Sequence, residues 1–202
     1  MNLRYLLRPE EQRRDLIAKN IKNGVVLDLG SQEGDLHNFL KENVKNSEIM
    51  GINIVKNKNV DVLNNLNFGI CIADNSVDSI VAGEVIEHLL NPFGFLQECY
   101  RILKDKGRLI ITTPNMTSLT YILKIQSIRR KLSIYERQDP HLYGFSMEML
   151  ELLLEKAGFK ILNKKYLVVG WRKNILFRVI CYLFKNIRPT LFIVAMKDDS
   201  YG

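Results

Sequence analysis

Several features that would define other protein classes are scarce in this chain. Its 202 residues include three cysteines, five prolines and one tryptophan. Cys71, Cys99 and Cys181 are far apart and form no CxxC pair or zinc-ligand spacing, so neither a disulfide framework nor a metal site is expected. No apolar run approaches the roughly 20 residues that span a bilayer. We therefore expect one globular domain, residues 1–202, in the reducing cytoplasm.

Short β-branched runs alternate with helical patterns along the chain, which is typical of a parallel sheet covered by helices. The expected strands are 25–29, 49–54, 79–82, 108–112, 161–169 and 190–196, with a weaker strand near Val60. Helices are expected from Pro9 to Asn20, from Pro92 to a stop at Gly107, and from the cap Ser146 to Gly158. This order of elements predicts an α/β fold.

A loop that contains two glycines follows the first expected strand, in VVLDLGSQEGDL at residues 25–36. Glycine lets the backbone turn sharply and approach a ligand, and open α/β sheets bind ligands beyond the carboxyl ends of their strands. A dinucleotide site needs G-x-G-x-x-G, whereas this loop has Gly30, Gln32 and Asp35. An acid there suits S-adenosylmethionine (SAM), which has no phosphate. An ordinary strand-to-helix turn is the alternative.

Residues 73–115 carry a longer pattern, ADNSVDSIVAGEVIEHLLNPFGFLQECYRILKDKGRLIITTPN. Its D-x-S-x-D, E-x-I-E-H-L and E-x-x-R-x-L-K elements, and its strand ending in T-P-N, resemble class I SAM-dependent methyltransferases. The resemblance covers roughly residues 21–165 and is greatest for the small-molecule branch, which includes quinone, sugar and methionine-pathway enzymes. It implies a Rossmann-like fold with a seven-stranded, mostly parallel sheet, helices on both faces, and SAM as cofactor.

The same resemblance implies a set of cofactor-binding residues. They are Asp28 at the end of the first strand, Gly30, Ser31, Gln32 and Gly34 in the loop that follows, Asn53 and Ile54 at the end of the second strand, Asp61 and Val62 after the third, and Gly83 after the fourth. The family usually has glycine at the position of Gln32 and an acid at that of Asn53. An amide at Asn53 can still hydrogen-bond the ribose diol. Asp61 is expected near the adenine amino group, or else as a plain loop residue.

Glu84 and His88 are the catalytic candidates, because four residues apart on a helix they would share a face. His88 could remove a proton from a hydroxyl acceptor. A structural histidine, bonded to a carboxylate or to the backbone, is the alternative. His141 and Asn115 are further candidates near the acceptor, and each could instead hold its own loop.

Positive charge is concentrated late in the chain. Residues 1–118 hold 14 Lys/Arg and 15 Asp/Glu, whereas residues 119–188 hold 14 and 5. Basic, apolar helical insertions are expected near 119–138 and 171–188. They would fit an anionic membrane surface, or else cover the acceptor site or form a dimer contact. A nucleic-acid partner is not expected, and the sequence leaves the oligomeric state open.

The leading hypothesis is SAM-dependent methyl transfer to a small-molecule or lipid- or glycan-linked acceptor. The enzyme would be cytoplasmic, with peripheral binding to the inner membrane face as a further hypothesis. Gln32 and Asn53 motivate one alternative, a methyltransferase-like protein that binds SAM with little turnover. The basic half motivates another, an RNA methyltransferase, although the chain has no N-P-P-Y-type catalytic tetrapeptide.

Overall fold

A computed structural model describes residues 8–31, 35–118, 141–169, 179–181, 183–184 and 187–198. Most of the two expected helical insertions, near 119–138 and 171–188, lies outside these residues, as do Gln32 and Gly34. Among the described helices, none is long and apolar enough to cross a membrane.

A seven-stranded sheet with the order β3-β2-β1-β4-β5-β7-β6 forms the centre of the fold. The strands are β1 (Val25–Leu29), β2 (Glu48–Asn53), β3 (Val62–Leu63), β4 (Val77–Gly83), β5 (Leu103–Pro114), β6 (Phe159–Leu167) and β7 (Thr190–Lys197). Strands β1 to β5 pair in parallel, whereas β7 runs antiparallel to both β5 and β6. The expected Rossmann-like, mostly parallel sheet is therefore confirmed.

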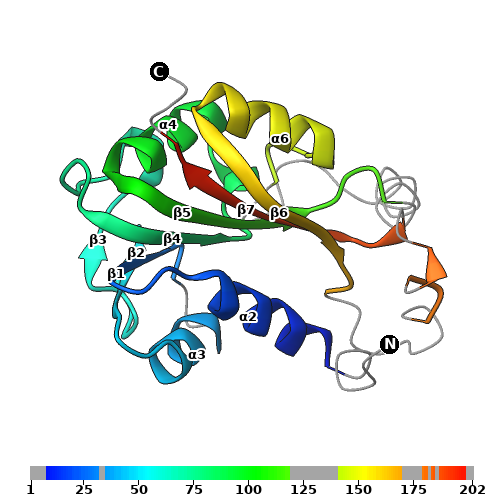
Figure 1. Ribbon diagram of the computed structural model, residues 1–202, viewed down its shortest axis with the longest axis horizontal. Coiled ribbons are helices and arrows are strands. Elements are labelled where there is room, and N and C mark those ends of the chain that lie inside the picture. The colour runs from blue at the N-terminus through cyan, green and yellow to red at the C-terminus, as the bar shows by residue number, and fades with distance from the viewer. Residues whose placement is uncertain are drawn as a thin grey trace.

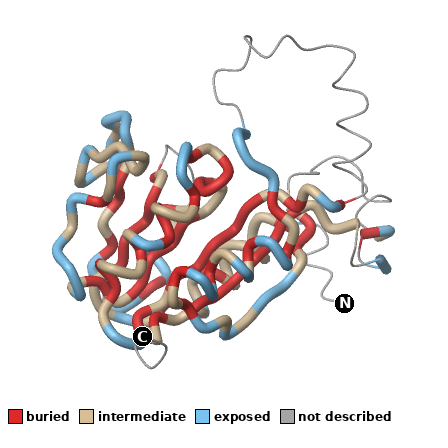
Figure 2. The backbone as a smooth tube through the Cα atoms, turned by 90° about the horizontal axis from the view of Figure 1, so that it is seen from above, coloured by how far each residue is buried: buried red, intermediate tan, exposed pale blue. Residues whose placement is uncertain are grey.

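Helices cover both faces of this sheet (Figure 1). Helices α2 (Pro9–Asn20) and α3 (Asp35–Asn43) lie on one face, and α4 (Pro92–Ile102) and α6 (Met147–Lys156) lie on the other. Neighbouring residues of β1 show why both layers are needed: Val26 packs in the cluster that contains Ile17 of α2, whereas Leu27 packs with Leu96 of α4. The strands at the centre of the sheet are buried along most of their length, as Figure 2 shows.

Local capping signals set the starts of two helices where the sequence predicts them. The Asn91 side chain accepts a hydrogen bond from Gly94 N at 2.9 Å, and Pro92 begins α4. The Ser146 hydroxyl accepts one from Met149 N at 3.1 Å at the start of α6. Each bond satisfies a backbone donor that the helix itself leaves free.

Other boundaries differ from the sequence prediction. Helix α4 was expected to continue to a stop at Gly107, but it ends at Ile102 because Leu103 already pairs with Val77 in the sheet. The third strand is shorter and later than expected, Val62–Leu63 in place of a strand near Val60. Both differences come from strand pairing, which depends on residues distant in sequence.

Candidate active site

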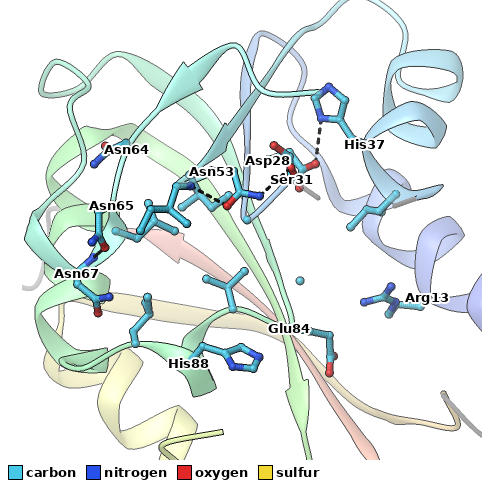
Figure 3. Close-up of a pocket in the computed structure, with 18 of the residues that line it drawn as sticks. Arg13, Asp28, Ser31, His37, Asn53, Asn64, Asn65, Asn67, Glu84 and His88 are labelled. Atoms are coloured by element: carbon cyan, nitrogen blue, oxygen red, sulfur yellow. Dashed lines mark hydrogen bonds and ion pairs between the residues drawn. The ribbon is translucent and has the colours of Figure 1, made fainter. Parts of the chain in front are cut away.

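A cavity of about 760 Å³ opens beyond the carboxyl ends of β1, β2 and β4. Strand β1 has β2 on one side and β4 on the other, so the chain reverses its direction of winding at this point. Open α/β sheets bind ligands at such a switch point, and the volume suits a nucleoside-sized ligand. Figure 3 shows the polar side chains around it, which come from α2, α3 and the loops after β1, β2, β3 and β4.

The glycine loop after β1 forms one wall of the cavity. Gly30 has φ +77, and a Cβ there would lie 2.5 Å from Val85 Cγ2. This position therefore needs glycine both for its backbone conformation and for the close approach of the loop after β4. The Gly30 and Ser31 amides both donate to Ile52 O, at 2.8 and 3.2 Å, which fastens the loop to β2.

Asn53, at the end of β2, also lines the cavity, but its amide group is already hydrogen-bonded to protein. Its Nδ2 donates to Ser31 O at 3.1 Å, and its Oδ1 accepts from Ile54 N at 2.7 Å. Figure 3 shows Asn53 between the Ser31 loop and the cavity. Ile54 lines the cavity too, with 61% of its surface exposed.

Asp61 and Val62 lie elsewhere than the resemblance implies. Asp61 precedes β3 and does not follow it, because the strand begins at Val62. The Asp61 carboxylate accepts a hydrogen bond from Gly51 N at 2.8 Å, so it closes the loop between β2 and β3. Neither residue is among those that line the cavity.

The residues that line this side of the cavity, in place of Asp61 and Val62, come after β3, and the sequence did not identify them. They are Asn64, Asn65, Leu66 and Asn67, at the start of the short helix η1 (Leu66–Phe68). The signal was the run of polar residues after the strand, which became informative only once the strand was placed at Val62–Leu63. Asn65 is fixed by its own backbone bond, since its Oδ1 accepts from Asn67 N at 3.1 Å.

Asp28 forms a buried pair with His37 of α3. The distance from Asp28 Oδ2 to His37 Nδ1 is 3.0 Å, and both residues are almost fully buried. Burial raises the pKa of Asp28, and the hydrogen bond from His37 only partly opposes this. His37 is a further site residue that the sequence did not identify, because in sequence it resembles any residue of an amphipathic helix.

Gly83 is the last residue of β4, and both it and Glu84 line the cavity. Figure 3 shows Glu84 on the opposite side of the cavity from Asn64, Asn65 and Asn67. Glu84 and His88 were expected on one face of a helix, and this is wrong: Glu84 has φ +60, and only the short helix η2 (Ile86–His88) follows. Burial and the nearby Glu87 carboxylate raise the pKa of Glu84 to about 7. Both side chains nevertheless reach the cavity.

Helix α2 brings positive charge to the Glu84 side of the cavity. Arg13 and Arg14 line the cavity, and Arg13 Nη1 lies 3.4 Å from Thr112 Oγ1. The charge of Arg13 partly opposes the rise in the pKa of Glu84. These arginines were also missed, because the helix precedes every motif of the family block.

His88 lies at the cavity wall with a buried carboxylate next to it. Its Nε2 is 3.9 Å from Glu87 Oε1, and Glu87 Oε2 accepts a hydrogen bond from Thr113 Oγ1 at 2.8 Å. The ring of His141 lies edge-on to that of His88, with centroids 4.7 Å apart. Leu142 N and Tyr143 N both donate to Glu87 O, which holds the His141 loop against η2.

Two imidazoles and a carboxylate meet at this point. The ligand atoms of Glu87, His88 and His141 all lie within 4.8 Å of one another, so within the described part of the chain this group could hold a metal ion. No metal site was expected from the sequence, because His141 is far from the other two along the chain.

Asn115 does not line the cavity. Its Nδ2 donates to Arg188 O at 3.0 Å, and its Oδ1 accepts from Thr117 N at 3.1 Å. Asn115 therefore holds the turn after β5, which was one of the two roles left open for it.

Comparison with known proteins agrees with this cavity. The chain matches the family model described as "Methyltransferase domain" over residues 2–164, and it therefore belongs to this family. The matched stretch is therefore a methyltransferase domain, and its cofactor is S-adenosylmethionine.

Relatives with assigned names match a shorter stretch. The mitochondrial ubiquinone biosynthesis O-methyltransferase of Rattus norvegicus is 40% identical over 85 residues, which is 42% of this chain and 25% of that protein. A probable S-adenosylmethionine-dependent methyltransferase of Mycolicibacterium smegmatis is 38% identical over 93 residues, 44% of this chain and 30% of that protein. The matched stretches thus span less than a third of these relatives.

Solved structures show the same fold at low sequence identity. A SAM-dependent methyltransferase from Aquifex aeolicus has a TM-score of 0.61 and 20% identity, and covers 98% of this chain and 94% of its own. One from Archaeoglobus fulgidus has a TM-score of 0.63 and 21% identity, with 96% and 99% covered. The [4+2]-cyclase SpnF also shares the fold, at a TM-score of 0.64 and 17% identity, covering 93% and 80%. The fold alone therefore does not define the reaction.

Proposed function

We propose that the enzyme methylates a hydroxyl group of a small molecule, with His88 as the base that accepts the hydroxyl proton. The observation that carries this proposal is His88 at the cavity wall with the buried Glu87 carboxylate 3.9 Å from its Nε2. A carboxylate beside an imidazole can stabilise the cation that forms when the imidazole accepts a proton from the acceptor. Some of the relatives are named as ubiquinone biosynthesis O-methyltransferases, which supports the choice of oxygen as the acceptor atom.

The cavity offers a different environment to each end of the cofactor. Arg13 is the cation suited to the carboxylate of the methionine portion. On the asparagine side, the Oδ1 atoms of Asn65 and Asn67 accept backbone N–H groups, so their NH₂ groups are the donors suited to the adenine edge. Gly30 leaves room for the backbone to approach the ligand closely. When bound, SAM supplies a methyl group on a positively charged sulfur, which leaves as a neutral thioether.

The residues of this chain then have two tasks in the reaction. The cavity wall from Glu84 to Leu89 aligns the acceptor hydroxyl with the methyl group. His88 takes the hydroxyl proton as the new O–C bond forms, so that the product leaves as a neutral ether. Glu87 stabilises the imidazolium that results, and Thr113 holds Glu87 in place.

Methyl transfer from radiolabelled SAM to two probes, catechol and aniline, tests this proposal. We expect label in catechol and a decrease in kcat of about 100-fold or more in His88→Gln, with the Kd for SAM unchanged. Transfer to aniline but not to catechol would contradict oxygen as the acceptor atom. Normal turnover of catechol by His88→Gln would contradict the role of His88.

We also propose that the enzyme binds the anionic face of a membrane peripherally, where a lipid-linked acceptor would lie. In the described part of the segment 171–188, Leu183 and Phe184 are 72% and 59% exposed. Exposed bulky side chains beside basic residues favour insertion into a membrane interface.

A further inference from the structure

The carbonyl oxygen of Ser31 accepts two hydrogen bonds from side chains at the end of β2 and in the loop that follows it. Asn53 Nδ2 and Asn57 Nδ2 each donate to it at 3.1 Å. Ser31 itself is buried and lies directly after Gly30, at the cavity wall. The two lone pairs of this carbonyl are therefore both used by the protein.

The orientation of both amide groups follows from their other bonds. Asn53 Oδ1 accepts from Ile54 N at 2.7 Å, and Asn57 Oδ1 accepts from Asn59 N at 2.8 Å. If either amide were turned over, its oxygen would face the Ser31 carbonyl and its NH₂ group would face a backbone N–H. Each side chain is thus required as a donor toward Ser31 and as an acceptor on its other side.

The loop that carries these asparagines is itself anchored to the sheet. The Ser31 hydroxyl donates to Asn59 O at 3.3 Å, and Gly51 N donates to Asp61 Oδ2 at 2.8 Å. A Cβ at Gly51 would lie 1.9 Å from Asn59 O, which shows how closely the loop packs on β2. The two amides therefore connect a fixed support to the glycine loop.

We propose that Asn53 and Asn57 are positioning residues, an amide clamp that holds Gly30 and Ser31, the described start of the glycine loop, in the position that receives SAM. The proposal rests on the assignment of SAM to this cavity. It also explains the departure from the family pattern at position 53. An acid there would put a carboxylate oxygen about 3 Å from the Ser31 carbonyl oxygen, where it could not donate and would be repelled.

Asn57 separates this proposal from direct ribose binding, because it does not line the cavity whereas Asn53 does. Any effect of Asn57 on SAM is therefore indirect. The change Asn57→Asp keeps the size of the side chain and the oxygen that accepts from Asn59 N, whereas it replaces the donor to Ser31 O with a charged acceptor. Asn57→Ala removes both the donor and the acceptor without adding charge, and it serves as the second variant if the aspartate variant folds poorly.

Asn43 offers a matched control. Its Nδ2 donates to Phe39 O at 2.8 Å on an exposed helix surface away from the cavity. Asn43→Asp therefore makes the same chemical change at a position that does not line the cavity. If Asn53 bound the ribose directly, Asn53→Asp would lower the Kd for SAM, because a carboxylate would strengthen the bonds to the ribose hydroxyls. The clamp predicts that the same change raises this Kd.

The experiment is calorimetric titration of each variant with SAM, together with its melting temperature. We expect Asn57→Asp and Asn53→Asp each to raise the Kd about tenfold, Asn57→Ala to raise it about threefold, and Asn43→Asp to leave it unchanged. If Asn57→Asp binds SAM as tightly as the unmodified chain, or if Asn53→Asp binds it more tightly, the clamp is refuted. If the unmodified chain binds no SAM, the cofactor assignment fails instead.

Discussion

Arg101, near the end of α4, binds residues 70–74, the segment that follows the asparagines of the cavity wall. Its guanidinium donates to Ile70 O at 2.8 Å and to Ile72 O at 3.0 Å, and it makes two bonds of 2.9 Å to the carboxylate of Glu98. It also pairs with Asp74. Glu98 in turn accepts from Ile70 N at 2.9 Å. This network fixes the chain just after Asn67.

The magnitude of the effect of Arg101→Ala follows from these bonds. Bonds to a buried charged group contribute about 1.5 to 3 kcal/mol each, whereas exposed ion pairs contribute about 0 to 1 kcal/mol. The Arg101 side chain is 33% exposed, so it lies between these limits. Two carbonyl bonds of about 1 kcal/mol each and about 1 kcal/mol for the Glu98 pair give about 3 kcal/mol.

Urea unfolding followed by circular dichroism measures this loss. Arg8→Ala is the control, because Arg8 also pairs with a glutamate, Glu11, at 2.8 Å but is 72% exposed. We expect the control to change the free energy of unfolding by less than about 0.5 kcal/mol. Arg101→Lys should lose about half as much as Arg101→Ala, because it keeps the charge without the planar fork. Equal losses in Arg101→Ala and Arg8→Ala would refute the network.

Three further predictions follow from single sites. Gly30→Val should raise the Kd for SAM more than tenfold in calorimetry, because position 30 has φ +77 and its Cβ would meet Val85 Cγ2 at 2.5 Å; normal affinity would place SAM elsewhere. The hydrogen bonds from Arg101 lower the pKa of Glu98, so Glu98→Gln should lower the free energy of unfolding at pH 7. The difference from the unmodified chain should disappear as the pH falls through and below the lowered pKa of Glu98. A difference that persists in acid would contradict this. Phe184→Glu should weaken sedimentation with anionic vesicles and leave SAM binding intact, whereas unchanged sedimentation would argue against an interfacial role for Phe184.

Two helix caps and the bounds of two elements were predictable from the sequence. Helix α2 and strand β1 have the bounds that the residue pattern predicts, Pro9–Asn20 and Val25–Leu29. Asn91 and Ser146 cap the helices that they were expected to cap. Each cap is a hydrogen bond between residues three positions apart, so the local sequence defines it. The short run of β1 lies between Gly24 and Gly30, which mark its ends in the sequence.

The catalytic side of the cavity was only partly predictable. Glu84 and His88 were identified as candidates, but no helix contains both of them. Glu84 has a left-handed φ, which an α-helix does not allow. Arg13 reaches the same cavity from α2 and was not identified. It meets Thr112 across 99 positions of sequence, and no local pattern reports a contact of that range.

The sequence by itself determined the class of this protein, because the family block is one contiguous run, residues 73–115, whose pattern is visible without the fold. Only the tertiary structure decided what Asn53 does. As a residue type it suited the ribose of SAM. In the structure its Nδ2 donates to Ser31 O, 22 positions away, and the Nδ2 of Asn57 donates to the same oxygen. A side chain's partner depends on which loops the sheet brings together, and pairing of β1 with β2 is what brings these two together.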